Sequence, residues 1–200
     1  MITDTAAKSF RKGLEKFVQF TDAEWDLVQE HLNLIHLKKK KHFVDAGKVC
    51  NDVGFVVSGS VRYYHIKDGE DITGYFSFEN ELASSYKSFL RREPSTYWIQ
   101  ALEDSLIVTI SYANMQRMLE HPIIGHKIER MGRLIAEHYI CCYEDRVASF
   151  INQTPEERYL HLLTTGRDIL QRMPQHYVAN YLGITPVSLS RIRRRILKAV

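Results

Sequence analysis

Residues 175–194 read QHYVANYLGITPVSLSRIRR and have the residue types of a helix-turn-helix at the required spacing. Two helices that cross closely need a small residue at the crossing, which Ala179 supplies, and Gly183 supplies the positive φ that the turn needs four positions later. Thr185 and Pro186 are a favourable N-cap and first residue for the second helix. The apolar residues expected to hold the two helices together are Val178, Leu182, Ile184, Leu189 and Ile192.

The second helix would have one apolar face and one exposed, basic face. The exposed face carries Val187, Ser190, Arg191 and Arg194. We expect it to read base edges in the major groove of DNA, with Arg191 as the main contact, because arginine pairs bidentately with guanine. Contacts to DNA phosphates, which position a protein without specifying a sequence, are expected from Gln175, Ser188, Arg193 and Arg195.

The distribution of charge supports a polyanionic partner. Residues 171–200 hold six Lys or Arg and no Asp or Glu, in a chain of 200 residues whose formal net charge is +3, so the rest of the chain carries a net charge of −3. A basic end on an acidic body is typical of proteins that bind nucleic acid. The alternative is a frayed basic tail, or an ordinary helical hairpin whose basic face is solvated.

The first half of the chain has a sequence pattern that is typical of β-structure. Thr21 followed by Glu24 first predicts a short helix with a capping box. Short β-rich runs then alternate with turn residues, which is the pattern of a sandwich or barrel. These runs cover residues 53–57, 60–66, 72–78, 97–101 and 106–110, and a further short helix is expected within residues 79–94.

A long helix is expected after Pro122, which suits the first turn of a helix. Its apolar residues recur at the four-three spacing of a coiled-coil seam, and other apolar residues lie off the seam. A helix that is apolar on two sides needs two partners, so we expect its own β-domain on one side and an identical helix of a second copy on the other. The expected dimer seam is Ile124, Ile128, Met131, Ile135, His138 and Cys142. The alternative is a helix buried within one chain.

Composition and motifs exclude several classes. The three cysteines give neither a disulfide framework nor a zinc spacing, and no run approaches the roughly 18 apolar residues of a membrane span. Residues 1–10 lack the pattern of a secretory signal, so a cytoplasmic location is expected. No nucleophile elbow, phosphate loop or paired-histidine motif occurs, so we expect neither an enzyme nor a metal site.

Taken together, these features resemble the Crp/Fnr family of transcription regulators over nearly the whole chain. VVSGSVRYY at residues 56–64 is similar to a turn of the family's β-roll, residues 76–108 to its phosphate-binding cassette, and residues 184–196 to its recognition helix. The resemblance implies an α+β fold: a double-stranded, jelly-roll-like β-roll (1–120), a dimerisation helix and hinge (121–153) and a helix-turn-helix domain (154–200). The family's two-stranded wing after the recognition helix is expected to be absent or truncated.

The cassette departs from the members of the family that bind cyclic AMP. These carry a Gly-Glu pair and later an Arg-Ser or Arg-Thr pair, whose arginine neutralises the cyclic phosphate. The matching residues here are Asn80, Glu81, Ser95 and Thr96. Losing a hydrogen bond to a charged group costs about 1.5–3 kcal/mol, so we do not expect cyclic AMP. Either an unidentified small ligand or no ligand remains open, and Arg91 or Arg92 could replace the missing arginine or simply face solvent.

The resemblance implies a dimeric, sequence-specific regulator of transcription that reads a palindromic operator. Its implied partners are double-stranded DNA, a second copy of the chain and RNA polymerase. Val187 stands where the family has an acidic base-reading residue, so the operator should differ from that of the cyclic AMP receptor. The alternative is a ligand-sensing dimer that has lost DNA binding.

Overall fold

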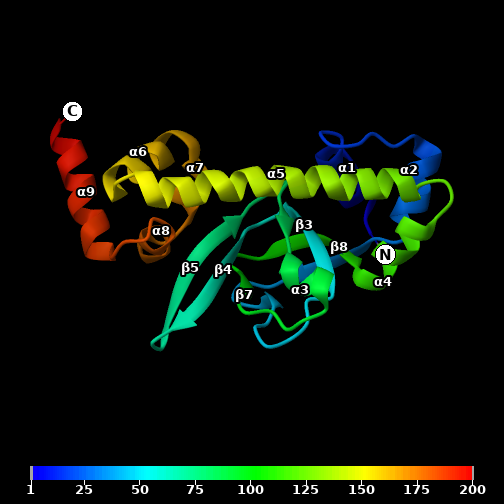
Figure 1. Cartoon of the computed structure of the whole chain (residues 1–200), viewed down its shortest axis with the longest axis horizontal. Coiled ribbons are helices and arrows are strands. Elements are labelled where there is room, and N and C mark those ends of the chain that lie inside the picture. The colour runs from blue at the N-terminus through cyan, green and yellow to red at the C-terminus, as the bar shows by residue number, and fades with distance from the viewer. Residues whose placement is uncertain (1, 200) are drawn as a thin grey trace. The chain divides into compact units, whose positions relative to one another are not determined.

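The computed structural model describes residues 2–199 and, among these, the side chains of residues 2–197 (Figure 1). Its helices are α1 (Asp4–Leu14), α2 (Asp22–Gln29), α3 (Tyr86–Arg91), α4 (Tyr112–Glu120), α5 (Gly125–Asn152), α6 (Pro155–Thr165), α7 (Arg167–Arg172), α8 (Gln175–Tyr181) and α9 (Pro186–Ala199). Its strands are β1 (Asn33–Leu37), β2 (His42–Val44), β3 (Asp52–Ser58), β4 (Val61–Lys67), β5 (Glu70–Ser77), β6 (Leu82–Ala83), β7 (Trp98–Ala101) and β8 (Ser105–Ser111).

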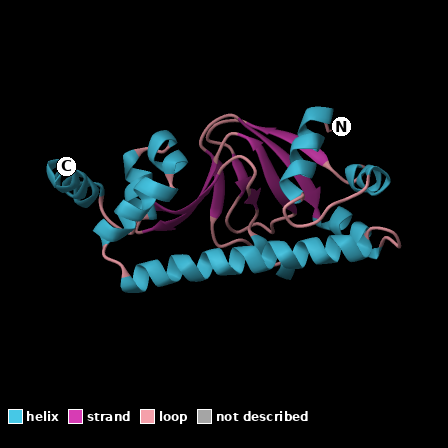
Figure 2. Ribbon diagram, turned by 90° about the horizontal axis from the view of Figure 1, so that it is seen from above, coloured by secondary structure: helices cyan, strands magenta, loops and turns pink. Residues whose placement is uncertain are grey.

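The chain divides into two compact units. The first contains Met1–Tyr63 and Phe76–His138, and the second contains Tyr64–Tyr75 and Tyr139–Val200. The chain passes between the units along β4, along β5 and along α5, which is a single unbroken helix (Figure 2).

The strands form two four-stranded sheets, in the orders β1-β8-β3-β6 and β2-β7-β4-β5. β8 pairs antiparallel with both β1 and β3, and the side chains of Val56 and Ile107, which face each other in the register of β3 and β8, are fully buried. The two sheets enclose an apolar core, as alternating strands predict. The predicted α+β fold with a β-roll, a long helix and C-terminal helices is therefore confirmed. The sequence patterns missed β1, β2 and β6.

A second core of the first unit is formed by side chains of α1, α2, α4 and α5 together with β3 and β8. α1, which was not predicted, buries Ala6, Ala7, Phe10 and Leu14, and Phe10 contacts the rings of Trp25 and Phe55. The spacing of these four residues is helical, and Thr3 accepts a hydrogen bond from the backbone of Ala6 as an N-cap. The signal for α1 was thus present in the sequence.

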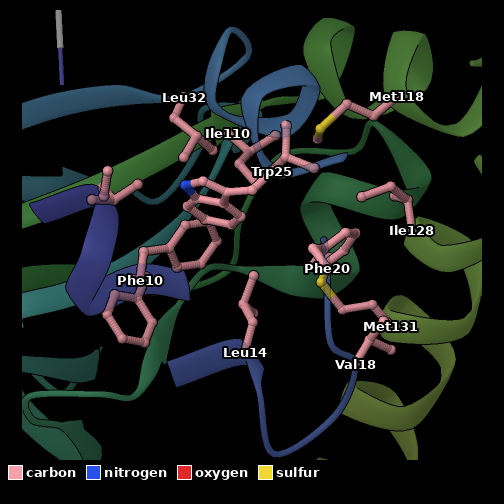
Figure 3. Close-up of a cluster of buried hydrophobic side chains, with 14 of the residues drawn as sticks. Phe10, Leu14, Val18, Phe20, Trp25, Leu32, Ile110, Met118, Ile128 and Met131 are labelled. Carbon is pink, nitrogen blue, oxygen red and sulfur yellow. The ribbon is translucent and has the colours of Figure 1, made fainter. Parts of the chain in front are cut away.

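The first half of α5 completes this core, so the expected dimer seam is wrong there. Ile124, Ile128 and Met131 are 0%, 1% and 4% exposed and pack in one cluster with side chains of α1 and α2. Figure 3 shows Ile128 and Met131 beside Phe20 and Val18 of the same chain. The four-three spacing correctly placed Ile128 and Met131 on one face of α5, with Ile124 directly before the helix, but the apolar N-terminal segment of the same chain packs against all three.

The rest of the expected seam is less buried: Ile135 and Cys142 are half-buried and His138 is exposed. Ile135 packs against the edge of the same cluster, and the ring of His138 lies 5.9 Å from that of Phe17. Burial within one chain, the predicted alternative, therefore describes only the first half of this face, and the dimer contact predicted for His138 and Cys142 stays a prediction.

An ion pair fastens α5 to α2. Glu24 closes the predicted capping box of α2 by accepting hydrogen bonds from Thr21, and it also accepts one of 2.6 Å from the ammonium group of Lys127. These bonds, that from Lys127 above all, lower the pKa of Glu24 to about 2. The carboxylate therefore stays ionised over the range in which ordinary glutamates take up a proton.

The second unit contains a small helical core. Its α6 begins as the sequence predicts, with a capping box of Thr154 and Glu157 and with Pro155 at the first position. The residues buried in this core are Tyr159, Leu162, Met173, Val178, Ala179, Leu182, Leu189 and Ile192. Five of these eight come from the predicted helix-turn-helix: the small residue Ala179 and four of the five predicted apolar residues, while the fifth, Ile184, is half-buried.

Two neighbouring isoleucines test the placement of the α5 face. Ile124 is fully buried, whereas Ile123 is 54% exposed. We expect Ile124→Ala to lower the free energy of unfolding by about 2–5 kcal/mol, because it removes methyl groups and leaves a cavity. The control Ile123→Ala should change it by less than about 0.5 kcal/mol. Urea unfolding at two protein concentrations measures both. A loss for Ile124→Ala that depends on protein concentration would instead place this residue in an interface between copies.

Candidate functional site

The turn between α8 and α9 has the geometry that a tight helix-turn-helix needs. Gly183 has a φ of +70°, in the left-handed region that glycine tolerates. The backbone N–H of Gly183 donates to Asn180 and that of Ile184 donates to Ala179, which is the pattern of a Schellman motif. A Cβ atom at Gly183 would lie 2.7 Å from the ring of Phe150. Both backbone angle and space therefore favour glycine at this position.

The start of α9 is capped as the sequence predicts. The Thr185 hydroxyl accepts a hydrogen bond of 3.1 Å from the backbone N–H of Ser188, and Pro186 is the first helical residue. The hydroxyls of Thr185 and Ser188 lie 3.0 Å apart. Ser188 is thus tied into the helix start, and the backbone N–H of Leu189 donates to the carbonyl oxygen of Thr185 at 3.0 Å.

α9 has the two faces that its sequence indicates. Leu189 and Ile192 are 1% and 5% exposed and hold the helix against its own unit. The opposite face is accessible to solvent, and Val187 alone is 60% exposed. The four residues predicted to read bases all lie exposed on this face: Val187, Ser190, Arg191 and Arg194. They project from one rigid, capped helix rather than from a loop.

Two of the predicted phosphate-binding arginines already have polar neighbours in the chain. Arg193 donates a hydrogen bond of 2.5 Å to the side chain of Gln175, so the structure brings together two residues that were predicted separately as backbone contacts. Arg195 forms an ion pair of 2.5 Å with Glu156 of α6. Both pairs are exposed or nearly so. They hold the arginine side chains in defined positions along the edge of the basic face.

A stripe of exposed apolar side chains lies on the second half of α5. Ile140, Tyr143, Val147 and Ile151 are 57%, 58%, 56% and 80% exposed. Together with Glu144 and Ala148 they line a shallow, almost entirely apolar groove. Apolar residues at this spacing form a continuous face on a helix, which we call the α5 stripe. The α5 stripe is not the predicted seam. The spacing of apolar residues from residue 140 to residue 151 is the sequence pattern that could have predicted it.

In the β-roll, Ser95 is turned inward and bonded to its own neighbours. It is 4% exposed, and its hydroxyl lies 2.9 Å from the Ser85 hydroxyl and 2.7 Å from the carbonyl oxygen of Tyr97. It also accepts from the backbone N–H of Tyr97. A hydroxyl with three such neighbours has little remaining hydrogen-bonding capacity for a phosphate.

The other three predicted pocket residues do not converge with Ser95 on one centre. Glu81 closes its own turn by accepting from the backbone N–H of Phe78 at 3.0 Å. Asn80 is exposed, with a φ of +69°, and Thr96 is exposed as well. The left-handed conformation of Asn80 explains the glycine that cyclic-AMP-binding relatives are implied to carry at this position, since asparagine tolerates it next best.

Neither nearby arginine replaces the missing one. Arg92 turns away to donate to the carbonyl oxygens of Cys50 and Phe89 and to the side chain of Asn51, and its guanidinium stacks 4.2 Å from the ring of Tyr112. Arg91 is exposed on α3. The interpretation that Arg91 faces solvent holds, whereas Arg92 is committed to the loop before β3.

Two tyrosines that were not predicted occupy the interior beside the cassette. The rings of Tyr63 and Tyr97 have centroids 6.1 Å apart and pack against the core of the roll. The Tyr63 hydroxyl lies 2.9 Å from that of Ser77 and donates to the carbonyl oxygen of Leu82. The chain therefore places its own rings and hydroxyls against the cassette backbone.

Comparison with known proteins identifies the first unit. The family model described as "Cyclic nucleotide-binding domain" matches residues 34–121, which run from β1 to the end of α4. This stretch is similar to cyclic nucleotide-binding domains. No curated protein matches the sequence of the chain.

Solved structures with a similar fold align with more of the chain than the family model does. A putative transcriptional regulator of the Crp/Fnr family from Eubacterium rectale aligns over 90% of this chain and 85% of its own length, at 17% identity and a TM-score of 0.69. FixK2 from Bradyrhizobium japonicum aligns over 84% and 85%, at 20% identity and 0.62. The c-di-GMP-responsive global regulator CLP from Xanthomonas campestris aligns over 85% and 88%, at 12% identity and 0.64. The resemblance to Crp/Fnr regulators is thus confirmed for the fold.

Among the described residues no group of three or more His, Cys, Asp or Glu side chains is placed to hold a metal ion. No helix in the described part of the chain is long and apolar enough to cross a membrane.

The internal hydrogen bonds of Ser95 lead to a prediction for the β-roll. We expect saturating cyclic AMP to leave the melting temperature unchanged, because Ser95 offers no charge and its hydroxyl is bonded internally. Differential scanning fluorimetry with cyclic AMP, and with 5′-AMP as the matched control nucleotide, measures this. A rise in melting temperature that is specific to cyclic AMP would contradict the expectation, since any ligand that binds only the folded state stabilises it.

Proposed function

We propose that this protein is a dimeric transcription regulator that recognises a palindromic DNA site through α9. The observation that carries the proposal is the face of α9 formed by Val187, Ser190, Arg191 and Arg194, which is exposed on a capped helix held from behind by a packed core. A helix with these two faces suits entry into the major groove. The fold shared with Crp/Fnr regulators supports the same function.

The four residues have distinct expected roles. Arg191 and Arg194 would donate to guanine O6 and N7 or to nearby phosphates, and Val187 would contact the methyl group of thymine. Ser188 lies at the start of α9, where the positive end of the helix dipole favours a phosphate. Gln175, Arg193 and Arg195 would add phosphate contacts at the edges, with Arg195 exchanging Glu156 for the DNA backbone.

The α5 stripe supports the dimer. A second copy that packed its own stripe against this one would form a two-fold interface, in which each side chain meets its counterpart or a near neighbour. The exposed Ile140, Tyr143, Val147 and Ile151 would then be removed from water. The α5 stripe is favoured over the first half of the predicted seam, because Ile124, Ile128 and Met131 are buried in their own chain.

We also propose that the protein acts without catalysis and that its β-roll has no need of cyclic AMP. The inward hydroxyl of Ser95 and the tyrosine rings at the cassette support the second point. The alternative function is a sensing dimer without DNA binding, and the test of α9 separates it from the main proposal.

Arg191 is expected to make the main contact with DNA bases. Duplexes selected from a random library by the wild-type protein should be palindromic, and their affinity should fall steeply with salt because phosphate contacts release counterions. Arg191→Ala should lose about 1–3 kcal/mol of binding free energy and relax the choice of base at one position in each half-site. Fluorescence anisotropy at several salt concentrations measures both effects.

The matched control is Arg91→Ala, which removes an exposed arginine from α3 in the other unit. It changes the net charge equally and should leave affinity and base preference as in the wild type. No enriched sequence for the wild-type protein, or equal effects of Arg191→Ala and Arg91→Ala, would favour the sensing dimer instead.

The α5 stripe is expected to hold two copies of the chain together. Val147→Asp should convert dimers to monomers, because a charge would have to be buried without a partner, and it should weaken association at least about ten-fold. Helix content and melting temperature of the monomer should be maintained, since Val147 is 56% exposed within one chain. Sedimentation velocity and circular dichroism measure these properties.

Ile123→Asp places the same charge on a residue that is 54% exposed but lies outside the stripe. This control should stay dimeric. Dimers of Val147→Asp that are as stable as those of the wild type would show that another surface joins the two copies.

A further inference from the structure

The hairpin of β4 and β5 connects the two units. Its two-residue turn, Asp68 and Gly69, has φ values of 54° and 83°, which are those of a tight type I′ turn. The bases of both strands, up to Tyr63 and from Phe76, belong to the first unit, while the tip, Tyr64–Tyr75, belongs to the second unit together with the helix-turn-helix. We call residues 64–75 the hairpin tip.

Arg146 of α5 joins the hairpin tip to α8. Its guanidinium donates hydrogen bonds to the carbonyl oxygen of Gly74 at 2.8 Å and to that of Tyr181 at 2.9 Å. The same group lies 4.0 Å from the ring of Tyr181 and 5.0 Å from that of Phe150. A planar guanidinium can serve two acceptors and stack on rings at the same time, which an ammonium group cannot do.

Two further contacts hold the same hairpin tip. The side-chain amide of Asn180 in α8 donates to the carbonyl oxygen of Asp71 at 3.1 Å. The ring of Tyr75 stacks on that of Tyr143 in α5, with centroids 6.4 Å apart. Gly74 and Asp71 thus each present a backbone oxygen to a side chain from the helical part of the unit.

The contact of Arg146 reaches the part of α8 that sets the turn. Tyr181 is the last residue of α8, and carbonyl groups at a helix end lack helical partners. Arg146 satisfies that of Tyr181, and Arg158 satisfies that of Leu182 at 3.0 Å. Burial, with the neighbouring charge of Arg146, lowers the pKa of Arg158. Gly183, with the ring of Phe150 against it, follows directly and begins the turn into α9.

We propose that Arg146 and Asn180 are positioning residues that clamp the hairpin tip to α8, so that the strands β4 and β5 control the order of the helix-turn-helix. α5 is then not the sole connection through which the β-roll influences α9. The clamp itself depends only on the contacts given above, while its consequence for DNA recognition rests on the proposed function.

Hydrogen exchange of the full-length protein without DNA tests the clamp. In Arg146→Lys, which keeps the charge, and in Asn180→Ala, backbone amides of the hairpin tip should exchange at least about ten-fold faster. The controls are Arg133→Lys, an exposed arginine of α5 in the first unit, and Asn152→Ala, an exposed asparagine at the end of α5. Both should exchange as the wild type does. Unchanged exchange of the hairpin tip in both clamp variants would overturn the proposal.

A substitution in the hairpin alone tests whether the hairpin in turn affects α8. Gly69→Val strains the turn, because a φ of 83° disfavours a branched side chain, and a Cβ atom there meets nothing within 4 Å. Coupling between two elements is reciprocal, so the amides of α8 should also exchange faster. Faster exchange in the hairpin tip with no change in α8 would show that the tip is a passive neighbour, and would overturn the proposal.

A third arm adds the selected duplex. In the wild-type protein, DNA should slow exchange in the hairpin tip, and in Arg146→Lys and Asn180→Ala this slowing should disappear. Slowing that persists in both variants would contradict the clamp. A wild-type protein that binds no duplex would overturn the proposed function, while the two DNA-free arms would still decide the clamp.

Discussion

The burial of one face of α5 is the constraint on which the rest of the molecule depends. Ile124, Ile128 and Met131 fix the first half of the helix against α1 and α2, and the ion pair of Glu24 with Lys127 fastens the same junction. α5 continues unbroken to Asn152, and its second half carries the α5 stripe and Arg146. The buried face of the first half therefore leaves the second half as the part of α5 that offers apolar side chains to a partner.

The helix-turn-helix could be predicted because its local rules are strict. A tight turn between crossing helices requires a left-handed residue, a small residue and a cap, and Gly183, Ala179 and Thr185 meet these demands through backbone geometry alone. The faces of α9 follow from periodicity, which does not depend on the rest of the chain. The fold class followed from the alternation of strands and turns for the same reason.

The dimer face and the ligand site could not be predicted in the same way. Apolar residues recur on two faces of α5, and only the position of α1 decides which face is already occupied. The missing arginine at Ser95 was visible in the sequence, but the hydrogen bonds of Ser95 to Ser85 and Tyr97 depend on segments that meet only in the folded roll. The clamp likewise joins Arg146 to Gly74, which lies about 70 positions earlier in the chain, and no local sequence pattern predicts it.

The ion pair of Arg195 with Glu156 has a thermodynamic consequence for association with a polyanion. An arginine that already has a carboxylate partner exchanges one anion for another when it meets a phosphate, and the displaced carboxylate then needs a cation from solution. Such a contact releases fewer ions overall than one made by an unpaired arginine. The number of phosphate contacts inferred from the salt dependence of affinity would then be smaller than the number that the protein makes. The difference between the two numbers would equal the number of arginines that already pair with a carboxylate in the free protein.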